Sequence, residues 1–317
     1  MRYLNTPPPS WTNGVNVTFY SNIQYGESNI NNMDIFIPSD AVTPTGCIIN
    51  IHGGSFIYGD KSDIYDDAEK QAVIKEYLRQ GIAYVTINYT LVQQFNETVG
   101  IMPCMDSCVL ALQFIKFYAD SFNINKANIA LNGGSSGGGI ALWIAAQPSL
   151  ADPSNANHIK REDTDLVAIT LYIAQASYDF PGWDSEVFSA LGYNFSADYE
   201  TNKGTADGAN RTYGVSTLDE ISVEPTVSLR AELNMLTMIQ TNAAICPVYL
   251  KYNSPNYNEI VNNTIINGVH SDYQGEAIRL AISTYAPGSE VEYLLQTLYP
   301  DHVPASTLEA WLAQKVT

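Results

Sequence analysis

The sequence is poor in positive charge. Its 317 residues include 15 lysines and arginines against 33 aspartates and glutamates, a formal net charge of -18. Such a surface repels phosphate backbones and anionic lipid headgroups, which argues against nucleic-acid binding and electrostatic membrane docking. No apolar run approaches the 18 residues that suggest a membrane-spanning helix, and no apolar signal-peptide core follows Met1. We expect a soluble protein, either secreted with its signal peptide missing from this sequence or cytoplasmic.

Cysteine is also scarce. Four cysteines are too few for a disulfide scaffold in a chain of this length. Cys104 and Cys108 lie four residues apart, but no histidine or further cysteine nearby could complete a tetrahedral metal site. We therefore expect neither a metal nor another cofactor. With 45% hydrophobic and 15% charged residues, the chain has a globular composition and enough length for a large core.

Short apolar runs alternate with helical stretches along most of the chain. Near-continuous apolar strands separated by helices predict an α/β fold, with a mostly parallel sheet covered by helices on both faces. Two earlier runs, residues 15–20 and 33–37, predict an antiparallel hairpin at the edge of the sheet. The other expected strands are residues 47–51, 82–89, 128–132, 167–174, 248–252 and 291–298, and the expected helices are residues 66–80, 105–118, 140–146, 271–285 and 306–315.

One stretch, from about residue 180 to 245, interrupts the alternation. It mixes Gly, Asn, Asp and Tyr with a single helix-like segment near residues 229–239. A sheet does not need a long insertion between two of its strands, so such a segment usually has a function. We expect one domain over residues 1–317, with residues 180–245 as a lid or cap over the substrate site. The alternative is that the insertion has no function.

The strongest motif is the glycine-rich run at residues 132–139, between an expected strand and an expected helix. A Gly-x-Ser-x-Gly pattern centred on Ser135 fits a nucleophile elbow, in which a serine occupies a tight turn from strand to helix. A second register is centred on Ser136, but the strand is expected to end near Leu131, which favours Ser135. A phosphate-binding loop is disfavoured because no lysine follows the glycines.

A second motif ends the expected strand near Ile51. There His52 is followed by Gly53 and Gly54. Acyl transfer needs backbone N–H groups directed at the oxyanion that forms on attack, and two glycines after a strand leave such groups uncovered. Together with a serine elbow about 80 residues later, the glycine pair indicates an oxyanion hole.

In this order, the motifs resemble those of the α/β-hydrolase superfamily. They are similar to carboxylesterases with an HGG-type oxyanion motif, including the hormone-sensitive-lipase-like and feruloyl-esterase-like branches. The resemblance covers about residues 25–146 and 248–311, and the insertion between them matches no known pattern. The residues that carry it are His52-Gly53-Gly54-Ser55-Phe56, Gly59-Asp60-Lys61, Ile87-Asn88-Tyr89 and the run from Gly133 to Gly138.

The resemblance implies a catalytic serine and the groups that stabilise its oxyanion. Ser135 would be the nucleophile, and the amides of Gly53, Gly54 and Ser136 would be the oxyanion donors. One departure is Thr90, because these enzymes commonly have arginine after Asn-Tyr. We expect this change to remove a structural salt bridge rather than a catalytic group.

Of the four histidines, His302 is the expected general base. It follows the last expected strand and precedes the last helix, which agrees with the order serine, acid, histidine in this fold. His52 belongs to the oxyanion motif and is expected to orient it. His158 lies in a polar loop and is expected at the surface. His270 could line the substrate site or belong to a helix-capping loop.

The acid is less clearly marked. The fold places a carboxylate after the strand at residues 248–252, where Glu259 is the only acidic residue before Ser271. Glu259 is therefore assigned as the acid. Asp179, after the preceding strand, and Asp272 are the alternatives, as is a site without any acid.

These assignments predict a serine carboxylesterase that works through an acyl-enzyme intermediate. Its partner would be a small-molecule ester, with short-chain, aryl or carbohydrate-linked esters favoured. Tyr178, Phe180 and Trp183 could line an aryl pocket, or pack in the core. A catalytically impaired hydrolase fold used for binding is the alternative function, followed by a serine peptidase of the prolyl-oligopeptidase type, which the lack of a propeller-length N-terminal domain disfavours. The oligomeric state is left open.

Overall fold

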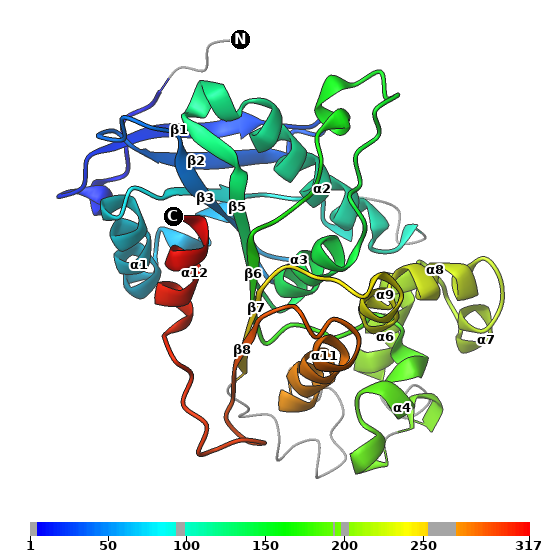
Figure 1. The fold of residues 1–317 in the computed structure, drawn as a ribbon. Coiled ribbons are helices and arrows are strands. Elements are labelled where there is room, and N and C mark those ends of the chain that lie inside the picture. Colours follow the sequence, from blue (N-terminus) through cyan, green and yellow to red (C-terminus); the bar gives the residue numbers. More distant parts are fainter. Residues whose placement is uncertain (1–4, 93–98, 193, 198–202, 253–270) are drawn as a thin grey trace.

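A computed structural model describes residues 5–92, 99–192, 194–197, 203–252 and 271–317, without the side chains of residues 203–207 (Figure 1). Its centre is an eight-stranded sheet in the order β1-β2-β4-β3-β5-β6-β7-β8. The strands are β1 (Val17–Gln24), β2 (Asn32–Pro38), β3 (Thr45–Ile51), β4 (Ala83–Ile87), β5 (Ile124–Gly134), β6 (Ala168–Tyr172), β7 (Val248–Tyr252) and β8 (Val291–Leu295).

Most neighbouring strands run parallel. β1 pairs antiparallel with β2, β2 pairs antiparallel with β4, and all other pairs are parallel. The predicted mostly parallel sheet and its antiparallel edge hairpin are both confirmed. Because parallel strands point the same way, their carboxyl ends share one edge of the sheet, and the loops that carry the catalytic motifs begin at this edge.

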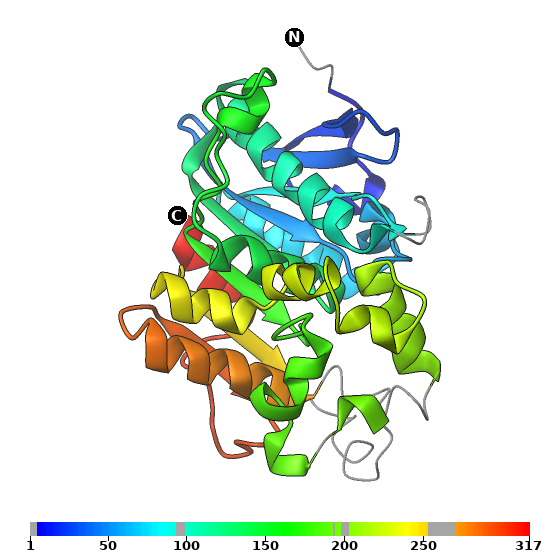
Figure 2. The same ribbon diagram turned by 90° about the vertical axis from the view of Figure 1, so that its right-hand side faces the viewer.

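Helices cover both faces of the sheet (Figure 1). One face carries α1 (Ala68–Arg79) and α12 (Leu308–Val316). The other carries α2 (Met102–Phe117), α3 (Ser136–Ala146), α9 (Met235–Asn242) and α11 (Asp272–Tyr285), which lie side by side as one layer (Figure 2). Short 3-10 helices connect some elements: η1 (Ser10–Thr12), η2 (Lys61–Ile64), η5 (Ala119–Phe122), η6 (His158–Arg161), η7 (Phe180–Gly182) and η8 (Ser189–Leu191).

Each face of the sheet has its own core. In β3, Cys47, Ile49 and Ile51 belong to the core under α2 and α3, whereas Ile48 belongs to the core under α1 and α12. This division follows from the alternation of side chains along a strand. A strand that buries both faces needs apolar residues at almost every position, which explains the near-continuous apolar runs.

The segment between β6 and β7 is mainly helical. It contains α4 (Trp183–Glu186), α6 (Lys203–Tyr213), α7 (Leu218–Ile221), α8 (Thr226–Glu232) and α9. The single helix expected near residues 229–239 is wrong, because α8 ends at Glu232 and α9 begins at Met235. The buried Asn234 starts the second helix, since its side chain accepts a hydrogen bond from the amide of Thr237.

Within the described residues, no helix is both long and apolar enough to cross a membrane.

Candidate active site

Ser135 forms the turn between β5 and α3. Its backbone has φ 52° and ψ -124°, in a region that residues with a side chain rarely adopt. The Ser135 amide donates to the carbonyl of Tyr172 in β6 at 2.8 Å, which holds the turn against the neighbouring strand. Ser136 is the first residue of α3 and is buried, with its hydroxyl 3.5 Å from that of Tyr89. Ser135, rather than Ser136, therefore occupies the apex of the turn.

The glycines around the serine allow the strand and helix to approach closely. A Cβ atom on Gly133 would lie 2.3 Å from the carbonyl oxygen of Gly137. A Cβ on Gly137 would lie 2.1 Å from the carbonyl oxygen of Ile51. Both distances are shorter than real contacts allow, so any larger residue would force β5, α3 and β3 apart.

The glycine pair of the HGG motif lies beside this turn. β3 and β5 are parallel neighbours with Ile51 opposite Gly133, so the chain leaving β3 reaches the elbow directly. A Cβ on Gly53 would lie 2.9 Å from the carbonyl oxygen of Gly134 and 3.3 Å from the Cβ of Ser135. Gly54 has φ +115°, and a Cβ there would lie 2.2 Å from the carbonyl oxygen of Tyr58, so this position requires glycine. The structure thus brings Gly53, Ser135 and Ser136 together.

His52 contacts both the glycine loop and Tyr89. Its ring stacks on Tyr89 with centroids 4.4 Å apart, and its Nδ1 lies 2.7 Å from the carbonyl oxygen of Gly53. Tyr89 in turn donates to the carbonyl of His52 at 3.1 Å. Burial lowers the pKa of His52, which favours a neutral ring whose Nδ1–H donates to Gly53. These contacts agree with the expectation that His52 orients the oxyanion motif.

A buried ion pair fixes the far end of the same loop. Lys61 Nζ lies 3.0 Å from Asp34 Oδ2, and both side chains are almost fully buried. The Lys61 amide donates to Asn88 Oδ1 at 2.5 Å, while Asn88 Nδ2 donates to Asp60 at 2.7 Å. Tyr65 also donates its hydroxyl to Asp34. The Gly59-Asp60-Lys61 and Ile87-Asn88-Tyr89 motifs therefore meet in one network that anchors the loop after β3.

Thr90 occupies the position where an arginine was expected, and it makes neutral hydrogen bonds there. Its amide donates to Ser107 Oγ at 3.1 Å, and its hydroxyl accepts from Asn31 Nδ2 at 3.0 Å. Both hydrogen bonds are buried, so the position is satisfied without a charge.

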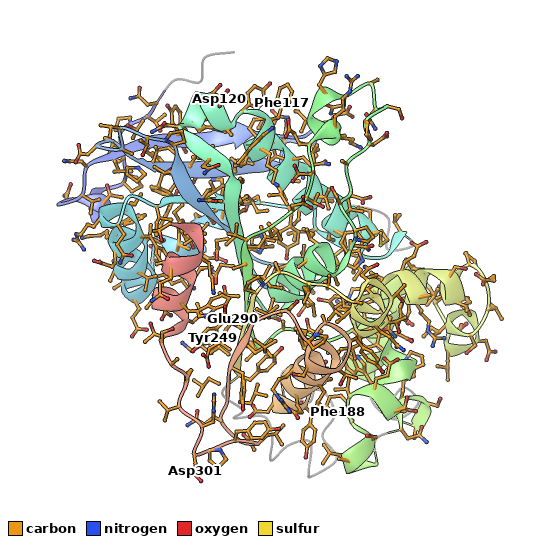
Figure 3. All side chains as sticks on the ribbon, viewed as in Figure 1. Phe117, Asp120, Phe188, Tyr249, Glu290 and Asp301 are labelled. Carbon is orange, nitrogen blue, oxygen red and sulfur yellow. The ribbon has the colours of Figure 1, made fainter. Side chains whose placement is uncertain are left out.

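The predicted base, His302, lies on the chain between β8 and α12. Its ring stacks on Tyr293 with centroids 4.0 Å apart, and its Nε2 lies 3.7 Å from Glu292 Oε1. Figure 3 shows its neighbour Asp301 on a loop that projects beyond the strands. His302 Nε2 has no hydrogen-bond partner among the described residues, so it makes no hydrogen bond to Ser135 in this structure.

The carboxylate candidates have different surroundings. Asp179 is paired with Arg230, whose Nε lies 2.8 Å from Asp179 Oδ1. Asp272, the first residue of α11, is fully buried and accepts hydrogen bonds from backbone amides after β8. Glu259 and His270 lie outside the described residues. A sequence pattern could not have revealed the surroundings of Asp272, because its partners lie 25 and 26 residues away.

The three aromatic residues after β6 pack together. Tyr178, Phe180 and Trp183 are buried, and the rings of Phe180 and Trp183 meet edge to face at 4.6 Å. Trp183 donates its indole N–H to the carbonyl of Ser177. Of the two roles expected for these rings, the structure supports core packing.

Comparisons with known proteins add to this picture. The family model BD-FAE matches residues 33–176, a little under half of the chain. No curated protein matches the sequence.

Several solved structures have the same fold. A truncated carbohydrate esterase from gut microbiota has a TM-score of 0.64 at 12% identity, covering 96% of this chain and 98% of its own. An inhibited esterase B from Lactobacillus rhamnosis has a TM-score of 0.59 at 14% identity, covering 93% and 81%. An acetyl ester-xyloside bifunctional hydrolase from Caldicellulosiruptor lactoaceticus also has a TM-score of 0.59 at 14% identity, covering 86% and 83%. These likenesses confirm the predicted fold: the chain has the α/β-hydrolase fold of these esterases.

Proposed function

We propose that the protein is a serine carboxylesterase that hydrolyses uncharged esters through an acyl-enzyme intermediate. The observation that carries this proposal is the contact between the glycine loop and the serine turn. A Gly53 Cβ would lie only 3.3 Å from the Cβ of Ser135, so the backbone of the glycine loop lies directly beside the strained serine. That is the arrangement needed to attack a carbonyl and stabilise the oxyanion that results.

In the first step, the Oγ of Ser135 attacks the ester carbonyl while His302 takes the hydroxyl proton. The carbonyl oxygen becomes an oxyanion, which the amides of Gly53, Gly54 and Ser136 stabilise. Ser136 begins α3, whose first N–H groups have no acceptor within the helix and whose dipole favours negative charge. The C–O bond to the alcohol then breaks, and the alcohol leaves with the proton from His302.

In the second step, water attacks the acyl-enzyme and gives up a proton to His302. The C–O bond to Ser135 breaks, and the acid is released as the serine recovers its proton. The sequence assigns the supporting carboxylate to Glu259. For His302 to act as base, its Nε2 must come within hydrogen-bond distance of the Ser135 hydroxyl, a contact that it does not make in this structure.

The substrate class follows from charge and from similar proteins. A chain with a net charge of -18 disfavours polyanionic substrates, and no cationic side chain belongs to the serine and glycine motifs. Proteins of the same fold are described as carbohydrate esterases and acetyl ester hydrolases. We therefore favour short-chain, aryl or carbohydrate-linked esters, with residues 180–245 as the cap that selects among them.

A fluorophosphonate probe tests the proposal. We expect covalent labelling of the wild-type chain, with the adduct located on Ser135 by mass spectrometry and absent from S135A. A series of p-nitrophenyl esters from acetyl to long acyl chains would then establish the length preference. A wild-type chain that remains unlabelled and does not hydrolyse these esters would refute the esterase proposal.

One observation favours a second candidate, a hydrolase fold that binds esters without cleaving them. It is that His302 stacks on Tyr293 while its Nε2 makes no hydrogen bond to Ser135. The same labelling experiment separates the two candidates, because a serine without a base reacts far more slowly with phosphonates.

A further inference from the structure

Asp272 anchors the loop that carries His302. Its Oδ2 accepts hydrogen bonds from the amides of Thr297 and Leu298, at 2.6 and 3.3 Å. These two residues follow β8 and open the loop toward α12. Asp272 thus connects the start of α11 to the start of the loop on which the proposed base lies.

The other oxygen of Asp272 has no hydrogen-bond partner within the described part of the chain. Oδ1 is buried, and it has no hydrogen bond with any residue that the structure describes. Burial also raises the pKa of Asp272, because removal from water disfavours the charged form. A neutral asparagine could accept the same two amide hydrogen bonds through its single oxygen, without the cost of burying a charge. Anchoring the loop therefore does not explain why this residue is an acid.

The loop that carries His302 is held by hydrogen bonds at both ends. At the start, Tyr299 donates its hydroxyl to Glu276 at 2.8 Å, and at the end Tyr249 donates to the carbonyl of Ser306 at 3.0 Å. Between them, His302 makes a ring contact with Tyr293, and its Nε2 has no hydrogen-bond partner among the described residues. His302 lies four residues beyond Leu298, so its Cα can be up to about 14 Å from that of Leu298.

Three other carboxylates in the described part of the chain are either paired with arginine or too far from His302 for a hydrogen bond. Asp179 is neutralised by Arg230, and Glu276 binds Arg279 through two contacts of 2.7 Å. Glu292 lies 3.7 Å from His302 Nε2, which is too long for a hydrogen bond.

We infer that Asp272, in place of Glu259, is the carboxylate that orients the imidazole of His302 during the reaction. The assignment rests on the proposed esterase function and makes Asp272 a positioning residue. When the loop brings His302 inward, Asp272 Oδ1 accepts the Nδ1–H of the ring. Nε2 is then left as the acceptor for the Ser135 proton, and the ionised carboxylate stabilises the imidazolium that forms.

The variant D272N tests this assignment. Its amide oxygen can still accept from Thr297 and Leu298, so the loop anchor is kept while the acceptor for His302 is lost. We expect kcat for p-nitrophenyl acetate to fall about 10³- to 10⁴-fold, with KM little changed because the lost interaction acts in the transition state. E292Q is the matched control, since it neutralises the carboxylate nearest to His302 in this structure, and it should keep the wild-type kcat.

A proton NMR experiment gives a second readout, independent of turnover. We expect a low-field resonance from the Nδ1 proton of His302 in the phosphonylated wild-type chain, absent from H302Q and D272N and present in E292Q and E259Q. Should D272N not fold, loss of this resonance in E259Q would still overturn the assignment, and its retention there would support it.

Three outcomes count against Asp272. A fall in kcat for E259Q as large as that expected for D272N would give the role to Glu259. A comparable fall for E292Q would give it to Glu292, and an undiminished kcat in D272N would reduce Asp272 to a loop anchor. The wild-type labelling of Ser135 separates these outcomes from failure of the proposed function, since a wild-type chain without any labelling contradicts the esterase proposal itself.

Discussion

The backbone at Ser135 should store strain that a glycine would release. With φ 52° and ψ -124°, the serine adopts a conformation that costs a residue with a Cβ about 1–3 kcal/mol. S135A and S135G both remove the nucleophile, so neither variant should be labelled by a fluorophosphonate. They differ in strain, because alanine keeps the Cβ and glycine does not. Their difference in stability therefore isolates the cost of holding a serine on this turn.

The expected difference can be worked out from two opposing effects. Relief of strain favours S135G by about 1–3 kcal/mol, while the greater freedom of glycine in the unfolded chain disfavours it by about 0.4–1 kcal/mol. We expect S135G to exceed S135A by about 1 kcal/mol in the free energy of unfolding, measured by urea denaturation. If S135G proved no more stable than S135A, the turn would not be strained and the reasoning would fail.

Three further changes test the surroundings of the serine. G53A places a Cβ 2.9 Å from a backbone oxygen of the elbow, so kcat on p-nitrophenyl acetate should fall about 10²- to 10³-fold; an unchanged kcat would remove Gly53 from the oxyanion hole. D34N leaves the ammonium of Lys61 buried without its counter-charge and should lower the free energy of unfolding by about 3 kcal/mol. The control E76Q removes an exposed carboxylate and should leave the free energy of unfolding nearly unchanged; equal losses in urea denaturation would contradict this. Because burial lowers the pKa of His52, the stability that depends on its neutral ring is present above the ordinary histidine pKa of about 6.5 and is lost as pH falls below that value. In thermal melts from pH 8 to 5, the melting temperature should therefore fall more steeply for wild type than for H52Q. Parallel curves would contradict this expectation.

The parts of the fold that depend on local pattern could be predicted from the sequence. Apolar runs that fill both faces of a strand gave the position of the parallel strands, and the glycines around Ser135 predicted a turn that no larger residues could form. These two features are encoded within a few residues of where they occur. The close approach of Gly53 to Ser135 also depends on β3 and β5 being neighbours in the sheet.

The features that the sequence did not predict depend on contacts between distant segments. The anchoring of Asp272 by the amide of Thr297 joins groups 25 residues apart, and no periodicity marks either residue. The position of His302 depends on the ring of Tyr293, which an analysis of motif order does not consider. Near residue 234, a capping asparagine overrides an apolar spacing that resembles one continuous helix.

Side-chain hydrogen bonds within the sheet bring the two halves of the serine site together. Asn50 of β3 lies opposite Asn132 of β5, which lies opposite Thr170 of β6. Asn132 donates to Asn50 at 2.7 Å and accepts from Thr170 at 2.6 Å, so one polar row crosses three strands near the carboxyl edge of the sheet. A parallel pair that slipped by one residue would break both bonds and turn apolar side chains to the wrong face. Since Gly53 and Ser135 each follow this row by three residues, the row fixes the register on which the distance between oxyanion loop and nucleophile depends.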